Sequence, residues 1–173
     1  MKFLEKNLED IICETSNEKL QERGLLIDGK KFRQVKLSHY GVADIISVKR
    51  YGQSLHIDLI ELKKDSISVD ALIQSLRYVE GIRHYLRKRS FNRKVFFTIK
   101  LCGNTVFNLK ELSLLCSYIT GNHKNVEFVD LYTYNYTMEG IFFEEQYSHI
   151  IDDRADCFNR VTFKNKDEKF DLF

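Results

Sequence analysis

The segment Leu55–Lys63 combines an apolar row with two charged side chains at its end. If the segment is a β-strand, alternation places Glu61 and Lys63 on the same face as its odd-numbered apolar residues. Moving two charges away from water is costly, and a bare ion pair recovers little of that cost. A divalent cation bound by Glu61, with Lys63 beside a reacting group, would explain the arrangement. The alternative interpretation is a solvent-exposed Glu-x-Lys at a strand end.

Asp44 is a second carboxylate that we expect near Glu61. It interrupts the apolar row of a predicted strand over residues 41–50, and Tyr51–Ser54 has the composition of a hairpin turn. Antiparallel pairing across such a short loop brings the start of the first strand near the end of the second. Two converging carboxylates repel each other unless a cation lies between them. The hairpin therefore predicts a cation beside Asp44 and Glu61.

The first predicted helix supplies two further candidate carboxylates. Apolar residues recur at helical spacing over residues 2–14. On a helix, Glu5 lies about 80° from the centre of the apolar face and Glu9 a further ~40° outward. We therefore expect Glu5, rather than Glu9, to face the protein. The alternative is that both are ordinary solvent-facing helix carboxylates.

Residues 67–89 form the strongest helical pattern in the chain. Its apolar residues lie on one face, Gln74 and Tyr78 lie four residues apart along one flank of that face, and Arg77 and Lys88 lie on the opposite face. An amphipathic helix with a solvated basic face explains the apolar positions. It does not explain a glutamine at the edge of the buried arc, although glutamine is a fair helix former.

The other segments complete an α/β pattern. We expect a connection over residues 15–31, a helix over 109–119 and strands over 32–37, 92–102, 126–136 and 140–150; the near-continuous apolar character of 92–102 predicts burial on both faces. The tail from Asp152 has no clear pattern. The order predicts a mixed central sheet flanked by helices. We expect one domain over residues 1–173, with its core at about 2–137 and a C-terminal strand and tail at 138–173.

Positive charge is concentrated in two places, although the net charge is only +2. A net charge this small does not by itself predict a nucleic-acid-binding protein. One basic cluster covers Arg77–Lys94 and the other covers Lys30–Lys36. Tyr132, Tyr134 and Tyr136 alternate on one predicted strand face, where they could stack on bases or serve as packing or as a protein interface.

Several other classes are excluded by what the sequence lacks. No apolar run approaches the ~20 residues of a membrane helix, and the N-terminus does not resemble a signal peptide. The four cysteines are scattered and are best interpreted as reduced thiols, so we expect a cytoplasmic protein with no membrane contact. The histidines show no zinc spacing, the serines no nucleophile elbow and the glycines no phosphate-binding loop.

The motifs together resemble a known family. A helical glutamate is followed by Gly41-x-x-Asp44, Glu61-x-Lys63 and Gln74-x-x-x-Tyr78. This order is similar to that of the PD-(D/E)xK nuclease superfamily, and closest to its NucS-like and RecB-like branches, in which segments similar to RQxxxxxxGxxDI, IELKK and QSLRYVE recur. The likeness covers residues 2–90, and Ala43 stands where the superfamily name has proline.

The resemblance implies a restriction-endonuclease-like α-β-β-β-α-β core with a metal site. Asp44 and Glu61 would bind one or two Mg²⁺ or Mn²⁺ ions, with the Leu62 carbonyl as a further ligand and water in the remaining positions. Glu5, or less readily Glu9, would bind the metal directly or through water. A metal there would also relieve the repulsion between the two carboxylates.

The resemblance also implies roles in catalysis and binding. Lys63 would orient the attacking water and stabilise the charge that develops on the phosphate, and Gln74 and Tyr78 would support the site. The basic clusters would bind phosphates without reading sequence; simple solvation is about equally expected for any one of these residues. The candidate contacts are Arg33, Arg77, Arg83, Arg87 and Lys88.

The implied activity is Mg²⁺-dependent hydrolysis of DNA phosphodiester bonds, in repair, restriction or the biology of a phage or mobile element. The residues do not separate DNA from RNA. Many nucleases of this type pair to cut two strands, which leaves room for a homodimer. The alternative is a non-catalytic module on the same fold that binds nucleic acid or another protein.

Overall fold

The computed structural model describes residues 5–123, 125–148 and 162–163, so most of the tail that begins at Asp152 lies outside the described residues. In chain order the elements are α1 (Glu5–Glu14), α2 (Asn17–Glu22), β1 (Lys30–Lys36), the 3₁₀ turn η1 (Ser38–Tyr40), β2 (Val42–Tyr51), β3 (Ser54–Leu62), β4 (Ser66–Ile67), α3 (Val69–Lys88), β5 (Lys94–Gly103), β6 (Thr105–Val106), α4 (Leu109–Asn122), β7 (Val126–Thr137), β8 (Gly140–Ser148) and β9 (Thr162–Phe163).

The strands form a mixed sheet in the order β1-β2-β3-β5-β7-β8, with the two-residue β9 paired to β8. Neighbours at both ends of the sheet run antiparallel, whereas β3, β5 and β7 run parallel to one another. The last five residues of the central strand β5 are buried, as expected for a strand covered on both faces. The predicted α/β class and mixed sheet are confirmed.

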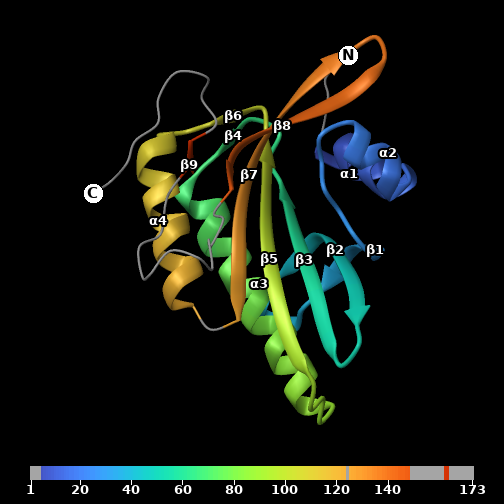
Figure 1. Cartoon of the computed structure of the whole chain (residues 1–173), viewed down its shortest axis with the longest axis vertical. Helices are drawn as coiled ribbons and strands as arrows, with labels where there is room; N and C mark the ends of the chain where they lie inside the picture. The colour runs from blue at the N-terminus through green and yellow to red at the C-terminus, as the bar shows by residue number, and fades with distance from the viewer. Residues whose placement is uncertain (1–4, 124, 149–161, 164–173) are drawn as a thin grey trace.

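Two helical layers cover the sheet. Figure 1 shows α3 and α4 on one side and α1 and α2 on the other. The first layer packs its apolar faces, including Val79 and Cys116, into one core cluster with β3, β5 and β7. The second contributes Leu8, Ile12 and Leu20 to a separate cluster on the opposite face. None of the helices in the described ranges is long and apolar enough to cross a lipid bilayer.

The β2–β3 hairpin has the expected register. Tyr51 pairs with Ser54 at the turn and Ile45 pairs with Ile60 at the far end. The next position along this antiparallel ladder lies between β2 residue 44 and β3 residue 61, where adjacent side chains point to the same face. The turn composition and the two apolar rows were therefore sufficient to align Asp44 with Glu61.

Gly41 allows the helix α3 to pack tightly behind β2. Its φ of +115° lies in a region that residues with a Cβ rarely adopt. A Cβ at this position would lie 2.9 Å from Cε1 of Tyr78. The glycine of the Gly-x-x-Asp motif thus has a physical reason, because only glycine lets the Tyr78 ring approach the chain three residues before Asp44.

The segment 15–31, expected to be a connection, contains the six-residue helix α2. Ser16 caps this helix by accepting a hydrogen bond from the Lys19 N–H (3.3 Å). Only Leu20 is buried in it. A single apolar position cannot display a helical period, which is why the sequence pattern missed the helix.

Replacement of Gly41 should be more destabilising than replacement of a glycine in open space. We expect Gly41→Ala to lower the free energy of unfolding by about 2–4 kcal/mol, since it combines backbone strain with a clash against Tyr78. Gly52→Ala is the matched control: φ is +55° but nothing lies within 4 Å of the added Cβ, so we expect a loss of about 1 kcal/mol. Urea denaturation of both variants measures the difference. Equal losses would contradict the packing argument.

Candidate active site

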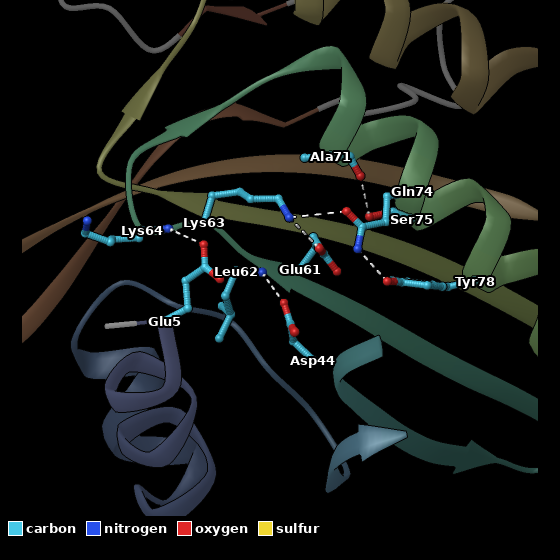
Figure 2. A network of polar contacts seen from close by, with 10 residues as sticks. All are labelled: Glu5, Asp44, Glu61, Leu62, Lys63, Lys64, Ala71, Gln74, Ser75 and Tyr78. Atoms are coloured by element: carbon cyan, nitrogen blue, oxygen red, sulfur yellow. Dashed lines mark hydrogen bonds and ion pairs between the residues drawn. The ribbon is translucent and has the colours of Figure 1, made fainter. Parts of the chain in front are cut away.

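Five of the sequence-predicted side chains meet at one end of the β2–β3 hairpin. Figure 2 shows Asp44 from β2, Glu61 from β3 and Lys63 just beyond it, with Gln74 and Tyr78 directed toward them from α3. The strands β2 and β3 and the helix α3 are held together by the core cluster on the α3 side of the sheet. The site therefore rests on strands and a helix rather than on long loops, which favours fixed side-chain geometry.

Glu61 is the most buried group of the site. It is 1% exposed, and its Oε1 accepts a hydrogen bond from Lys63 Nζ at 2.7 Å. Its Oε2 is buried and has no hydrogen-bond partner among the residues that the structure describes. Burial, together with the nearby Asp44 carboxylate, raises the pKa of Glu61 to about 7. Buried carboxylate oxygens nearly always have a partner, so this oxygen is a candidate ligand for a cation or a water molecule.

Asp44 is fixed by the backbone of the neighbouring strand. Its Oδ2 accepts a hydrogen bond from the Leu62 N–H at 2.9 Å. Burial raises the pKa of Asp44, and this hydrogen bond and the charge of Lys63 only partly counteract it. The hydrogen bond to Oδ2 thus fixes the orientation of the Asp44 carboxylate.

Lys63 connects the carboxylates to α3. Its ammonium donates to Glu61 and also to Gln74 Oε1 at 3.3 Å. The Gln74 amide in turn donates to the Tyr78 hydroxyl. Burial works to lower the pKa of Lys63, but hydrogen bonding and attraction to Glu61 outweigh it and leave the pKa raised. Lys63 therefore remains an ammonium in a fixed position.

The chain around Lys63 is anchored by groups from two other strands, β5 and β7. The Lys63 N–H bonds to the Cys102 carbonyl at 2.7 Å, and the Tyr134 hydroxyl donates to the carbonyl of Lys64 at 2.8 Å. Tyr134 was considered only as a member of a tyrosine row, for stacking or packing. Its role in holding this turn was missed, because nothing in the spacing connects β7 with a turn 70 residues earlier.

The expectation that Glu5 faces inward is wrong. Glu9 is buried, at 4% exposed, and accepts hydrogen bonds from Arg33 Nε (2.8 Å) and the Gln34 amide, whereas Glu5 is exposed. The helix pattern placed the core correctly but could not show that β1 brings an arginine and a glutamine to Glu9. Glu5 nevertheless lies at the rim of the site, where its Oε1 accepts from the Lys64 N–H at 2.9 Å.

The predicted phosphate contacts do not form one continuous row. Arg33 is paired with Glu9 and Asp10. Arg83 and Arg87 both pair with Glu80. On the α3 wheel these two arginines lie roughly 140–180° from Gln74, while Arg77 and Lys88 lie within about 60° of it. The second pair is therefore better placed to extend the site, and the binding role of all five remains a prediction. The paired residues are Arg33, Arg83 and Arg87; the exposed residues on the flank of Gln74 are Arg77 and Lys88.

A pocket of about 380 Å³ opens beside Asp44. Three carboxylates and two cations line it, so without a bound cation it would repel a phosphate. Its lining residues are Glu5, Lys6, Glu9, Arg33, Gln34 and Asp44.

The donor set fits a hard divalent cation with few protein ligands. Within the described ranges, no group of three or more His, Cys, Asp or Glu side chains is arranged to hold a metal. Asp44 and Glu61 form a pair, and no described part of the chain offers Glu61 Oε2 a hydrogen bond. Mg²⁺ commonly binds through one or two carboxylates and retains several waters. Two adjacent carboxylates with raised pKa values, Glu61 buried and Asp44 partly buried, are what such an ion would stabilise.

Comparisons of the chain with protein-family models, with curated proteins and with solved structures give no significant match. Functional assignment therefore depends on the geometry of the site and on the motif resemblance.

The raised pKa of Glu61 predicts a pH-dependent stability in the presence of a chelator. The folded-state pKa of about 7 exceeds the unfolded value of 4.5, so the folded protein retains a proton that the unfolded chain releases. The free energy of unfolding should therefore decrease as the pH rises from 4.5 to 7. Glu61→Gln, which mimics the protonated form, should remove this decline and stabilise the protein at pH 8 by on the order of 2–3 kcal/mol relative to its effect at pH 4.

Urea denaturation from pH 4 to 8 measures this effect. Asp44→Asn is the companion variant, because removing the neighbouring charge should move the decline to lower pH. Identical pH profiles for wild type and Glu61→Gln would show that Glu61 is ionised normally in the folded protein.

Proposed function

We propose that this protein is a divalent-metal-dependent nuclease that hydrolyses phosphodiester bonds in DNA. The observation that carries the proposal is the buried Glu61, with one oxygen on the Lys63 ammonium, the other without a partner, and a second carboxylate at Asp44 beside it. A purely structural ion pair would satisfy both carboxylate oxygens and would not place a second acidic group next to the first.

The chain's own groups divide the work of the reaction. Asp44 and Glu61 would hold the cation, which supplies a polarised water and neutralises charge on the phosphate. Lys63 is held by Glu61 and Gln74 where its ammonium can stabilise negative charge that develops on the phosphate. Gln74 and Tyr78 keep the Lys63 side chain from turning away into solvent.

The arrangement of elements supports the family resemblance. The described chain has a helix, an antiparallel three-stranded meander, a helix and a strand parallel to the third, with Asp44, Glu61 and Lys63 at the second and third strands. We take this order as support for the restriction-endonuclease-like α-β-β-β-α-β core that the resemblance implies. The helix α2 and the short strand β4 are additions to that order.

Electrostatics support a polyanionic substrate that binds fully only when metal is present. The pocket beside Asp44 is lined by an excess of carboxylates, and the exposed Arg77 and Lys88 lie on the flank of α3 that carries Gln74. Phosphate contacts of this kind give affinity without sequence readout. Roles in repair, restriction or a phage or mobile element all require such an activity.

Substitution of the site residues should abolish cleavage without unfolding the protein. We expect Asp44→Asn, Glu61→Gln and Lys63→Met each to reduce the rate of plasmid or single-stranded DNA cleavage in Mg²⁺ or Mn²⁺ by at least 100-fold, because metal binding or charge stabilisation is lost. Asp65→Asn and Lys64→Met are matched controls; Asp65 is 85% exposed and Lys64 points away from the site. Cleavage that survives all three site substitutions would refute the nuclease assignment.

Calorimetry with Mn²⁺ separates the nuclease from a non-catalytic module on the same fold. Wild type should bind the ion and Glu61→Gln should not, whereas a module that has lost catalysis would bind DNA and show no Mn²⁺ binding.

The two carboxylates of α1 should respond differently to substitution. Glu9→Gln should lower the free energy of unfolding by about 1–3 kcal/mol, because it removes the charge with which a buried side chain pairs with Arg33. Glu5→Gln should leave stability within about 0.5 kcal/mol and raise the Mg²⁺ concentration needed for half-maximal cleavage. Denaturation and a metal titration of activity measure the two effects. A stability loss for Glu5→Gln, with unchanged metal dependence, would assign Glu5 a structural role only.

A further inference from the structure

A second pocket, of about 540 Å³, lies between the α1–α2 helices and the β7–β8 hairpin. Two cations, Lys19 and Arg23, line it together with the aromatic ring of Tyr136. Glu14 is the single carboxylate in its lining. The charge balance is thus opposite to that of the pocket beside Asp44. The remaining lining residues are Ile11, Thr15, Ser16, Gly140 and Ile141.

The β7–β8 hairpin, which forms one wall of this pocket, is held by hydrogen bonds to the segment that follows α2. Figure 1 shows the end of β7 and the start of β8 as an orange hairpin that reaches beyond the sheet, over α1 and α2. Arg23 donates to the Glu139 carbonyl at 3.3 Å, and its own carbonyl accepts from the Phe143 N–H at 2.7 Å. A Cβ at Gly24 would lie 2.1 Å from the Phe143 carbonyl oxygen, so only glycine permits this contact.

Tyr136 is the exposed member of the tyrosine row on β7. Tyr132 and Tyr134 are buried at 2% and 5% exposure, whereas Tyr136 is 51% exposed. Packing therefore explains the first two rings, and Tyr136 presents an aromatic ring to the pocket. An aromatic ring with nearby cations is the combination that binds a base by stacking and its phosphate by charge.

The same helix connects this pocket with the candidate active site. Glu5, at the start of α1, accepts a hydrogen bond from the N–H of Lys64, which follows β3. Glu14, at the end of α1, lines the pocket. Nine residues of helix span roughly 14 Å. Tyr134, two residues before Tyr136 on β7, bonds to Lys64 as well. The pocket therefore lies a few nucleotides from the phosphate that would be cleaved.

We propose that this pocket is a nucleotide-binding subsite for single-stranded DNA, in which a base stacks on Tyr136 and an adjacent phosphate binds Lys19 and Arg23. The proposal rests on the proposed nuclease function and specifies its substrate, because a base paired inside a duplex cannot present its face to a side chain. Glu14 is available to accept a hydrogen bond from an exocyclic amine of the base.

Binding without cleavage tests the subsite directly. The protein carries Asp44→Asn, and fluorescein-labelled oligothymidylate is titrated by fluorescence anisotropy in a chelator. We expect Tyr136→Leu to weaken binding about 10-fold and Tyr136→Phe, which keeps the ring, to change it less than about 2-fold. Lys19→Gln should reduce the slope of log affinity against log salt by about 0.7. The matched controls on α4 are Tyr118→Leu, where the ring is 67% exposed, and Lys110→Gln.

Photocrosslinking gives an independent readout. Irradiation of an oligonucleotide that contains 5-iodouracil should attach it to the peptide that carries Tyr136, as identified by mass spectrometry. Equal affinities for Tyr136→Leu and Tyr118→Leu, with no crosslink at Tyr136, would overturn the subsite. If wild type cleaves DNA but these results are negative, the subsite fails and the nuclease stands. If binding depends on Tyr136 and Lys19 but wild type cleaves nothing with metal, the nuclease fails and the subsite stands.

Discussion

The structure is organised around the crowding of two carboxylates, Asp44 and Glu61, in a largely dry corner between a hairpin and a helix. Burial raises the pKa of both groups, and the Asp44 carboxylate raises the pKa of Glu61 further. Apolar residues of similar size at these two positions would make the folded protein at least as stable. The corner persists because its neighbours hold it on every side: the Leu62 N–H fixes Asp44, Lys63 fixes one oxygen of Glu61, and Tyr134 fixes the turn that follows.

The apolar cores of the protein offset the unfavourable free energy of burying these two carboxylates. Separate apolar clusters on the two faces of the sheet bury α3 and α4 on one side and α1 and α2 on the other. Each helical layer also contributes a polar group to the site: Gln74 comes from the first and Glu5 from the second. Because both layers are fixed by their own cores, the polar groups approach the carboxylates from opposite faces of one strand without depending on each other.

The features of the structure that depend on a local sequence pattern could be predicted. The hairpin register followed from the apolar alternation on each side of a short turn, and it aligned Asp44 with Glu61. Features that depend on contacts between distant segments were not accessible. Glu9 is buried because Arg33 reaches it from β1, and Tyr134 reaches the turn after β3 from β7, two strands away in the sheet. No periodicity within a single element contains such information.

Under the proposed function, the opposite charge balance of the two pockets would divide substrate binding into two parts. The pocket beside Asp44 has more carboxylates than cations and can hold a phosphate only after a divalent ion has reversed its charge. The pocket at Tyr136 has more cations than carboxylates and can bind a nucleotide without metal. Since α1 lies against both, a strand captured at the hairpin would be directed along this helix toward the carboxylates. In the proposed nuclease, the pocket at Tyr136 would supply affinity, and the Asp44 and Glu61 carboxylates would supply the chemistry.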